Sequence, residues 1–555
     1  MITLLEWFDS NLSYYYVFAL ASLFVFAALA IFSRRDTSTD FRCEATFLAI
    51  TALALFAWRW PTFLASYALS PDEGISVAGA LKLTADPVPW RGFDSTPDGP
   101  LSSYLLALPF SLGVPASFST ARVIGLGLLT VALWTLYYAF KWIGGSRVGR
   151  LSLLPPVMFL SLTQTGFVHF SNEYVSICLT SFVVAGTAYL VYGSGATWTR
   201  HLAGAGAGLS IGALLFVGIR VLPMAMTLFL LVIAALWSLR RRSSADAGLV
   251  TVTTLGSICL IPGIVLFTVW PTHTLGDAIV SYVKAPLAHF GASFMGWSFL
   301  WVSAKSYAVF LVASLLLLGA GAVAMVGRRV PSGSVLLLLA SGLLLVSSGY
   351  AIYHPREVNA HCLLLSVIPL SCCAGIIVHL IHDAGFWQAR AGLLSFSYLA
   401  LFAVPALSVA TVARSPLIGY SVHNWKHPQT GPAEAIARYA IPGSRIVVWG
   451  WMPECYVQTR TLMATRDPQT SAQIVEGPYR KYYRERFMID IQAHPPLVFV
   501  DAVGPGSWKF TDRANEGHEA FPALAAFIYD NYTIQEISGA TRIYKKDREP
   551  IGATP

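Results

Sequence analysis

Apolar runs long enough to cross a membrane recur through the first 412 residues of this chain. A membrane-spanning helix needs about 20 mostly apolar residues, and about twelve stretches meet that length. Charged residues make up only 12% of the chain, whereas soluble domains carry about 25%. The sequence therefore predicts an all-α polytopic membrane protein with about twelve transmembrane helices. The predicted spans lie at about 12–32, 44–64, 117–141, 150–168, 174–193, 202–219, 221–239, 248–269, 299–325, 333–350, 360–380 and 391–412.

Basic residues concentrate in the loops on one side of these spans. With the N-terminus outside, the cytoplasmic loops hold 13 of the 21 Lys and Arg residues that precede residue 413. Such an excess marks the cytoplasmic side of membrane proteins. We therefore expect a multi-pass protein of the cell (inner or plasma) membrane whose C-terminal segment lies on the non-cytoplasmic side. Two long loops, residues 65–116 and 271–298, are predicted on that same side.

The composition changes from about residue 413 onward. The segment 413–555 holds 16 Lys and Arg residues and 14 Asp and Glu residues, which is close to the charge content of a soluble domain. We therefore predict a transmembrane domain over 1–412 and a small soluble extracytoplasmic α/β domain over 413–555. Runs rich in β-branched and aromatic residues predict its strands. Its predicted strands are 445–451, 497–503 and 541–545, and its predicted helices are 432–440, 479–491 and 522–530.

An amphipathic stripe marks the loop at 271–298. Its apolar side chains recur at the spacing of one helix face, and Asp277, Ser281 and Lys284 lie off that face. A helix of this kind is typical of the membrane interface. The stripe consists of Leu275, Ala278, Ile279, Tyr282 and Val283.

A short polar stretch, Ser70-Pro71-Asp72-Glu73-Gly74, opens the first long loop. It has the pattern of a helix start: a serine N-cap, a proline at the first helical position, and two acids beside the positive helix end. Capping alone explains these residues. The stretch also lies at the mouth of a span, where a lipid-linked substrate would present its head group. Asp72 and Glu73 are therefore candidates for catalytic carboxylates as well as for caps.

Basic side chains on the same predicted side are candidates for binding an anionic group. Arg220 interrupts a long apolar run, and a charge in such a place is costly and hence functional by default. Lys284 belongs to the predicted interfacial helix. Further candidates at the mouth of a late span are His354, Arg356 and His361. Weaker candidates for substrate contacts are Lys82, Arg91 and Glu173.

Four sets of short motifs fit one known pattern when taken together. The acidic pair precedes Asp98-Gly99-Pro100-Leu101-Ser102-Ser103-Tyr104, and Ser119-Thr120-Ala121-Arg122 then opens a span. A glycine-rich span, 208–220, ends on a basic residue. A basic, His-containing turn begins the late span at 354–369, with a cysteine at position 362. The motifs of the tail are Trp449-Gly450, Arg460 and Ala464-Thr465-Arg466.

This set of motifs resembles the GT-C glycosyltransferases, in particular the protein O-mannosyltransferases, the bacterial lipid A aminoarabinose transferases and the RgtA/B/C/D-like enzymes. The family often has tyrosine where this chain has Cys362. The resemblance implies the GT-C fold. It also implies a polyprenyl-phosphate sugar as donor, a lipid- or polymer-borne hydroxyl as acceptor, and inverting transfer on the non-cytoplasmic face.

The resemblance also assigns roles. The counterpart of Asp72 takes the proton of the acceptor hydroxyl as a general base, and Glu73 would orient the acceptor or a neighbouring basic residue. Positive groups would stabilise the departing phosphate, and the candidates are Arg220, Arg356, His361, Lys284 and His354. No cofactor is predicted. No metal is predicted either, because the outer carboxylates show no ligand spacing; they are Asp72, Glu73, Asp94, Asp98, Glu173 and Asp277.

Two other functions are alternatives for a membrane protein of this kind. A polymerase or ligase acting on polyprenyl-linked glycans would need a large late outer loop, and here that loop, 351–359, is short. A lipid or glycolipid transporter would need ionisable groups near the bilayer midplane and repeated halves, whereas most charges here lie at span ends. The net charge of +8 resides largely in the cytoplasmic loops, so no nucleic-acid partner is expected. Membrane lipids, the donor and the acceptor are the expected partners.

Overall fold

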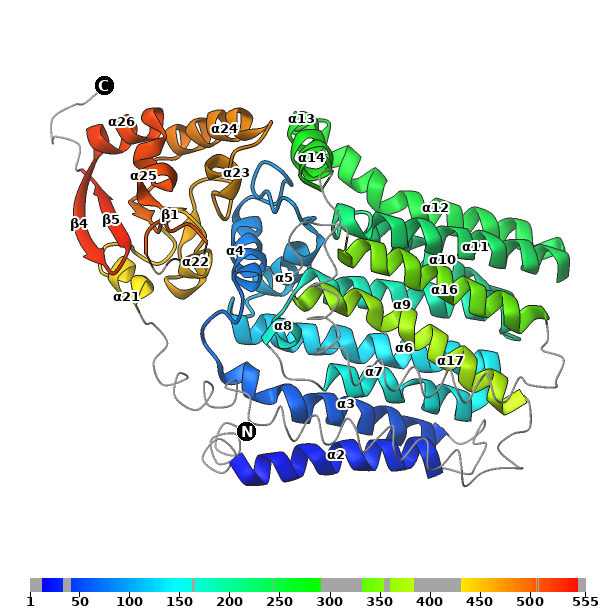
Figure 1. The fold of residues 1–555 in the computed structure, drawn as a ribbon. Helices are drawn as coiled ribbons and strands as arrows, with labels where there is room; N and C mark the ends of the chain where they lie inside the picture. The colour runs from blue at the N-terminus through cyan, green and yellow to red at the C-terminus, as the bar shows by residue number, and fades with distance from the viewer. Residues whose placement is uncertain are drawn as a thin grey trace.

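The computed structural model describes residues 12–32, 41–161, 165–242, 244–290, 332–353, 360–383 and 431–547, except 506 and 508. The predicted spans at 299–325 and 391–412 lie outside these residues, as do His354 and Arg356. Long helices run alongside one another and form one part of the molecule, and a β-sheet lies at one end of them (Figure 1). Helices α4 and α5 lie between the bundle and the sheet.

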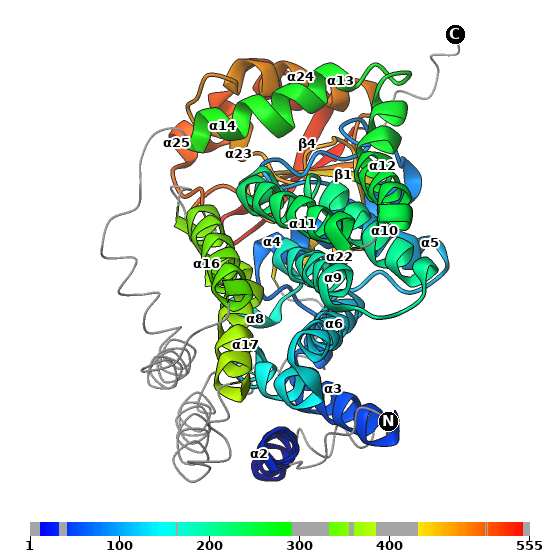
Figure 2. The ribbon, with the colours of Figure 1, turned by 90° about the vertical axis from the view of Figure 1, so that its right-hand side faces the viewer.

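A long helix covers most of each of nine of the ten predicted spans that fall on described residues. Among the described residues, seven helices are long and apolar enough to cross a membrane. The chain is therefore a multi-pass membrane protein. The turned view shows these helices close to end-on, with α16 and α17 along one flank (Figure 2). The long helices are α2 (Leu12–Phe32), α3 (Phe41–Leu64), α6 (Phe118–Ser152), α9 (Asn172–Tyr192), α10 (Thr197–Leu214), α11 (Leu222–Arg242), α12 (Ser244–Val269), α16 (Ser332–Tyr353) and α17 (Val367–Asp383).

The prediction of one span over 150–168 is wrong. Helix α6 continues to Ser152 across a kink at Gly144 and Gly145, and Gly145 has a positive φ of 85° that favours glycine. The Pro155-Pro156 pair begins a new short helix, because proline fits the first turn of a helix but not its interior. Two short helices result, α7 (Leu154–Leu160) and α8 (Thr165–Val168).

The apolar run at 202–239 is two helices, as predicted. Helix α10 ends at Leu214, and α11 begins at Leu222. Between them, a single 3-10 turn, η1 (Ile219–Val221), carries Arg220. The break leaves backbone N–H and C=O groups without helical partners, and Gly218 forms an antiparallel bridge with Asp98 there. Arg220, the charge within this apolar run, thus lies where the helix is interrupted.

The five-stranded sheet has the order β2-β1-β3-β5-β4. Strands β2, β1 and β3 are parallel, and β5 and β4 are antiparallel to their neighbours. All three predicted strands are present. The sequence missed β2, which has only two residues, and β4, most of whose side chains are polar. The strands are β1 (Arg445–Trp449), β2 (Leu462–Met463), β3 (Val498–Asp501), β4 (Tyr532–Ser538) and β5 (Thr541–Lys546).

Both faces of the central strands are covered, because successive side chains point to opposite faces. Val447 and Phe499 pack with Phe487 of α24 (Arg480–Ala493) and other residues of one core cluster. Val448 belongs to the cluster that continues into the bundle. This double burial explains why β1 reads as an unbroken apolar run. The other elements of this part are α21 (Pro432–Ala437), α22 (Glu454–Gln458), α23 (Ser471–Ile474), α25 (Arg513–Glu516), η4 (His518–Ala520) and α26 (Pro522–Asn531).

Helix α22 packs against α4 (Pro71–Ala85), the helix that carries the acidic pair. A Cβ placed on Gly74 would meet the Glu454 amide nitrogen and Pro453 Cγ at 3.0 Å. The absence of a side chain at Gly74 therefore allows this close approach. The acidic helix is held between the bundle and the sheet (Figure 1).

The predicted interfacial helix differs from its expected form. It consists of α13 (Leu275–Ala278), a π-helical turn η2 (Ile279–Lys284) and α14 (Ala285–Phe290). Tyr282 is buried against Trp90, whereas Ile279 and Val283 are exposed. The π-helical turn shifts the register, so the apolar stripe is divided between two faces.

Candidate functional site

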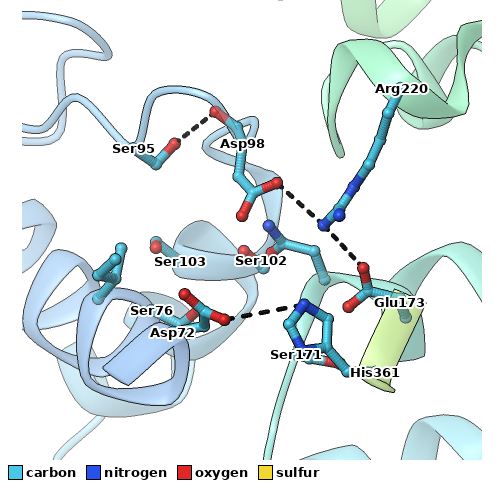
Figure 3. A pocket seen from close by; sticks show the side chains of 12 residues that line it. Asp72, Ser76, Ser95, Asp98, Ser102, Ser103, Ser171, Glu173, Arg220 and His361 are labelled. Atoms are coloured by element: carbon cyan, nitrogen blue, oxygen red, sulfur yellow. Dashed lines mark hydrogen bonds and ion pairs between the residues drawn. The ribbon is translucent and has the colours of Figure 1, made fainter. Parts of the chain in front are cut away.

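The polar stretch before α4 is a helix cap, as predicted. The Ser70 hydroxyl accepts a hydrogen bond from the Asp72 amide at 3.3 Å, and Pro71 is the first helical residue. The Glu73 carboxylate reaches back and accepts from the Leu69 amide at 3.0 Å. The Asp72 carboxylate is not needed for the cap, and it faces a small pocket instead (Figure 3).

Three helix N-termini surround this pocket. Helix α4 begins at Pro71, α5 (Leu101–Ser111) begins at Leu101, and α9 begins at Asn172. Helix N-termini present unpaired N–H groups and partial positive charge, which favour an anion. The residues in the first two turns of these helices that line the pocket are Asp72, Ile75, Ser76, Ser102, Ser103, Asn172 and Glu173.

Arg220 reaches into the pocket from the break between α10 and α11 (Figure 3). Its guanidinium pairs with Glu173 at 2.7 Å and with Asp98 at 3.2 Å. It also donates to Cys362 Sγ at 3.0 Å. These contacts use part of its five N–H donors, so the guanidinium is held in place from several sides.

His361 lies beside Asp72. Its Nε2 atom is 3.7 Å from Asp72 Oδ2, and its ring meets that of His169 edge-on at 5.3 Å between centroids. His361 is buried, whereas 29% of the Asp72 side chain is exposed. Asp72 is therefore one accessible carboxylate of the site, and it lies beside a buried histidine.

Asp98 is the second partly exposed carboxylate of the pocket. The surrounding protein, by displacing water, raises the pKa of Asp98 to about 6, although the Arg220 guanidinium opposes this shift. The Glu173 carboxylate raises the Asp98 pKa further. Asp98 therefore changes charge near neutral pH, directly beside Arg220.

Among the buried polar atoms of the pocket that lack a hydrogen bond to the described residues is one oxygen of Asn172. The Asn172 side chain is 8% exposed and lines the pocket. Within the described part of the chain, its Oδ1 atom has no hydrogen-bond partner. A buried polar group without a partner is costly, so this oxygen is available to a bound molecule or water.

Glu73 lies beneath the pocket and does not line it. Its carboxylate accepts hydrogen bonds from Arg122 Nε at 2.8 Å and from Arg122 Nη2 at 2.6 Å. Both side chains are fully buried. It also accepts from the Phe170 amide at 3.0 Å. Of the two predicted roles of Glu73, this geometry favours orientation of a basic residue over contact with the acceptor.

All five N–H donors of Arg122 are used. Besides Glu73, they reach the carbonyl oxygens of Thr62, Ala65 and Tyr67 at 2.6–2.7 Å. A fully bonded buried guanidinium is stable in spite of its desolvation. The Glu73–Arg122 pair thereby joins the starts of α4, α6 and α9, two of which form the pocket.

Three predicted binding residues do not line the pocket. Lys82 donates to the Met463 carbonyl at 2.7 Å, and Arg91 pairs with Asp86 at 2.7 Å. Lys284 is an exposed residue of η2. Lys82 thus bonds the C-terminal part, and Arg91 makes a contact within its own loop. Of the predicted residues on the described chain, the pocket brings together Asp72, Glu173, Arg220 and His361.

The sequence prediction did not include Asp98 and Asn172 among the site residues. Asp98 was noted within its motif but not assigned a contact. The available signal was its position two residues before a proline that precedes an apolar helix. Asn172 lies two residues before the predicted span at 174–193, in a polar connection between helices, where binding residues are common.

Glu173, His361 and Cys362 place ligand atoms within 4.8 Å of one another, as a metal site would. The Arg220 guanidinium, however, contacts two of these three groups. A cation is therefore already provided there by the chain. Of the six carboxylates considered for a metal, Asp94 and Asp277 are paired with arginines elsewhere.

No protein-family model and no curated protein sequence matches this chain. Its structure is similar to that of ArnT from Cupriavidus metallidurans bound to undecaprenyl phosphate, with a TM-score of 0.55 at 13% identity over 91% of this chain and 98% of that chain. The apo state of the same ArnT gives a TM-score of 0.54 at 13% identity, over 90% and 97%. Arabinofuranosyltransferase AftD from Mycobacteria gives 0.46 at 15% identity, over 93% of this chain and 42% of that chain.

Proposed function

We propose that this chain, which has the GT-C fold, is a membrane glycosyltransferase that moves one sugar from a polyprenyl-phosphate donor to a lipid- or polymer-borne hydroxyl. The observation that carries the proposal is the pocket itself. An accessible carboxylate, Asp72, lies in one pocket with Arg220 and three helix N-termini. A base and an anion-binding group are the two requirements of this reaction.

The anion-binding side of the pocket suits a phosphate. Arg220 and the starts of α5 and α9 line this side (Figure 3). Positive groups placed where charge develops lower the barrier, because they need no reorganisation during the reaction. ArnT, whose fold this chain shares, has been crystallised with undecaprenyl phosphate, which supports a donor of this class.

The bond changes follow from these positions. The acceptor oxygen forms a bond to the sugar C1 atom, and Asp72 accepts the proton of that hydroxyl. The bond between C1 and the phosphate oxygen breaks, and the electron pair leaves on polyprenyl phosphate. Attack from the face opposite the phosphate inverts C1. His361 would keep the Asp72 carboxylate oriented toward the acceptor.

We further propose that the pocket opens on the non-cytoplasmic side of the cell membrane and that the chain acts without a metal. The orientation rests on the distribution of basic residues in the loops. The metal-free mechanism rests on Arg220, which already contacts Glu173 and Cys362. A chelator should therefore leave transfer unchanged.

The proposal is tested with purified protein in lipid vesicles, labelled polyprenyl-phosphate sugars and an extract of membrane glycans. We expect the wild type to consume at least one donor. Arg220→Lys keeps the charge but loses the fork geometry, and we expect a drop of about 10²-fold or more in kcat/KM. Arg91→Lys alters an exposed pair and is the matched control. Failure of the wild type to consume any lipid-linked donor would overturn the proposed activity.

A second prediction concerns Asp98, which competes with phosphate for Arg220. Asp98→Asn should bind undecaprenyl phosphate roughly fivefold more tightly than the wild type above pH 7, because one partly exposed ion pair contributes up to about 1 kcal/mol. Below pH 5 the two proteins should bind equally, since the pKa of Asp98 is raised to about 6 and its side chain is then neutral. Equilibrium binding at both pH values checks this. Equal affinities at pH 8 would show that Asp98 does not compete.

A further inference from the structure

Two arginines of the C-terminal part, one buried and one partly buried, bind segments that lie far away in the sequence. Arg486 of α24 and Arg466, which follows β2, both contact the first long loop. Both also contact the segment 275–284. Such charges are expensive to bury unless their partners are well placed. The two arginines therefore form a specific junction between the C-terminal part, the first long loop and the segment 275–284.

Arg486 is the more deeply buried of the two, with 4% of its side chain exposed. It pairs with Asp94 of the loop at 2.7 Å and with Asp467 at 2.5 Å, and it donates to the Ser281 hydroxyl at 2.9 Å. Although burial raises it, the pKa of Asp94 is held below its usual range by the Arg486 guanidinium. The contact is therefore between charged groups.

Arg466 reinforces the same junction. It pairs with Asp490 of α24 and with Asp277 of α13, each at 2.7 Å. It also donates to the Trp90 carbonyl at 2.9 Å, and its own carbonyl accepts from the Asp94 amide at 2.9 Å. Asp277 and Ser281, two of the polar side chains that lie off the predicted interfacial stripe, thus bind the C-terminal part.

From Asp94 the loop turns directly into the pocket. The Asp94 carboxylate accepts from the Thr96 amide at 3.0 Å and from its hydroxyl at 2.5 Å. The Asp98 amide donates to the Ser95 carbonyl at 3.0 Å, and the Ser95 hydroxyl donates to the Asp98 carbonyl at 2.9 Å. These bonds make 94–98 a tight turn whose position follows that of Asp94.

The next residue joins the turn to the segment that carries Arg220. The Gly99 amide donates to the Val217 carbonyl at 2.8 Å, and the Leu101 amide donates to the Phe216 carbonyl at 3.2 Å. A Cβ on Gly99 would lie 2.0 Å from the Phe216 carbonyl oxygen, so only glycine allows this approach. The turn and the break before α11 are therefore connected by backbone bonds as well as by the Asp98–Arg220 pair.

We propose that the C-terminal α/β part positions the anion-binding side of the site, and that Arg486, clamped between Asp94 and Asp467, is the positioning residue. The clamp fixes the turn 94–98, and the turn fixes Asp98 and the segment 216–220. Arg486 itself does not line the pocket. The effect of Arg486 on catalysis rests on the proposed function. The positioning of the turn 94–98 by Arg486 does not.

The test compares Arg486→Met with Asp94→Asn, which keeps Arg486 paired with Asp467 and is the milder change. Arg513→Met is the matched control. Arg513 is also a partly buried arginine of the C-terminal part, with Asp501 at 3.0 Å, and its partners all lie within that part. Full-length protein in phosphatidylcholine vesicles is examined by hydrogen exchange of the peptides over 94–101 and 216–221, and by equilibrium binding of undecaprenyl phosphate.

Both clamp variants should exchange faster over 94–101 and 216–221 than the wild type, and the control should not. Undecaprenyl phosphate should bind about tenfold more weakly to Arg486→Met and several-fold more weakly to Asp94→Asn, with a twofold change at most in the control. Unchanged exchange in both clamp variants would overturn the inference, as would faster exchange with unchanged affinity. Faster exchange in a protein whose wild type binds no polyprenyl phosphate would support the mechanical link and count against the proposed function.

Discussion

Asp72→Asn should lower the rate of sugar transfer by about 10²–10⁴-fold, the usual contribution of a positioned general base. Asparagine has the same shape but cannot accept the proton of the acceptor hydroxyl. The effect should fall on kcat, whereas KM for the donor should change little, because Arg220 and the helix N-termini hold the phosphate. Initial rates with a labelled polyprenyl-phosphate sugar that the wild type consumes measure both constants.

Asp86→Asn is the control for this substitution. Asp86 follows the last residue of the same helix, α4, and pairs with the half-exposed Arg91. Its loss should leave transfer within about twofold of the wild type, since an exposed pair contributes little. Wild-type rates in Asp72→Asn would show that another group accepts the proton, and Asp98 would be the next carboxylate to substitute.

Arg122→Met should destabilise the protein by about 3–5 kcal/mol, because it leaves the Glu73 carboxylate buried without its cation. Three backbone carbonyls lose a donor at the same time. Thermal unfolding in detergent, followed by circular dichroism, measures the loss. Activity should fall together with the folded fraction, since the pair joins the starts of two helices that form the pocket.

The double variant Glu73→Gln with Arg122→Met separates charge from packing. It removes both charges and should recover part of the lost stability. Lys141→Met is the comparison at a less buried site, where the lysine pairs with Glu44 at 2.7 Å. Its cost should be under about 1 kcal/mol if solvent screens that pair. A loss in Arg122→Met no greater than that in Lys141→Met would contradict the structural role of the buried pair.

Patterns among residues that are neighbours in the sequence predicted the helices well. The start of α4 follows from Ser70 and Pro71, and the end of α10 near residue 214 agrees with the charge of Arg220 in an apolar run. Strand β1 could be predicted because it is a continuous apolar run with both faces covered. In each case, the signal lies within a window shorter than one element, so the sequence contains it.

The contacts of a side chain could not be predicted where a partner distant in sequence decides them. Lys82 was predicted as a substrate contact, but it bonds the Met463 carbonyl from the C-terminal part. Glu73 and Asp72 are neighbours in sequence, yet one is fully buried against Arg122 and the other faces the pocket. Adjacent helical side chains point about 100° apart, and only tertiary packing determines which one meets a cation.

Apolar runs alone predict that this chain spans a membrane many times, and the residues at 70–74 alone predict an acidic helix start near the mouth of a span. Hydropathy and capping are local properties, and they need no partner. Contacts between distant segments are what bring Asp72, Asp98, Glu173 and Arg220 into one pocket. Their assembly depends on bonds between distant segments, namely the Glu73–Arg122 pair, the Gly99–Val217 bond and the Arg486 clamp. The helix start at 70–74 therefore supplies the Asp72 carboxylate of the site. The break between α10 and α11 supplies its Arg220 guanidinium.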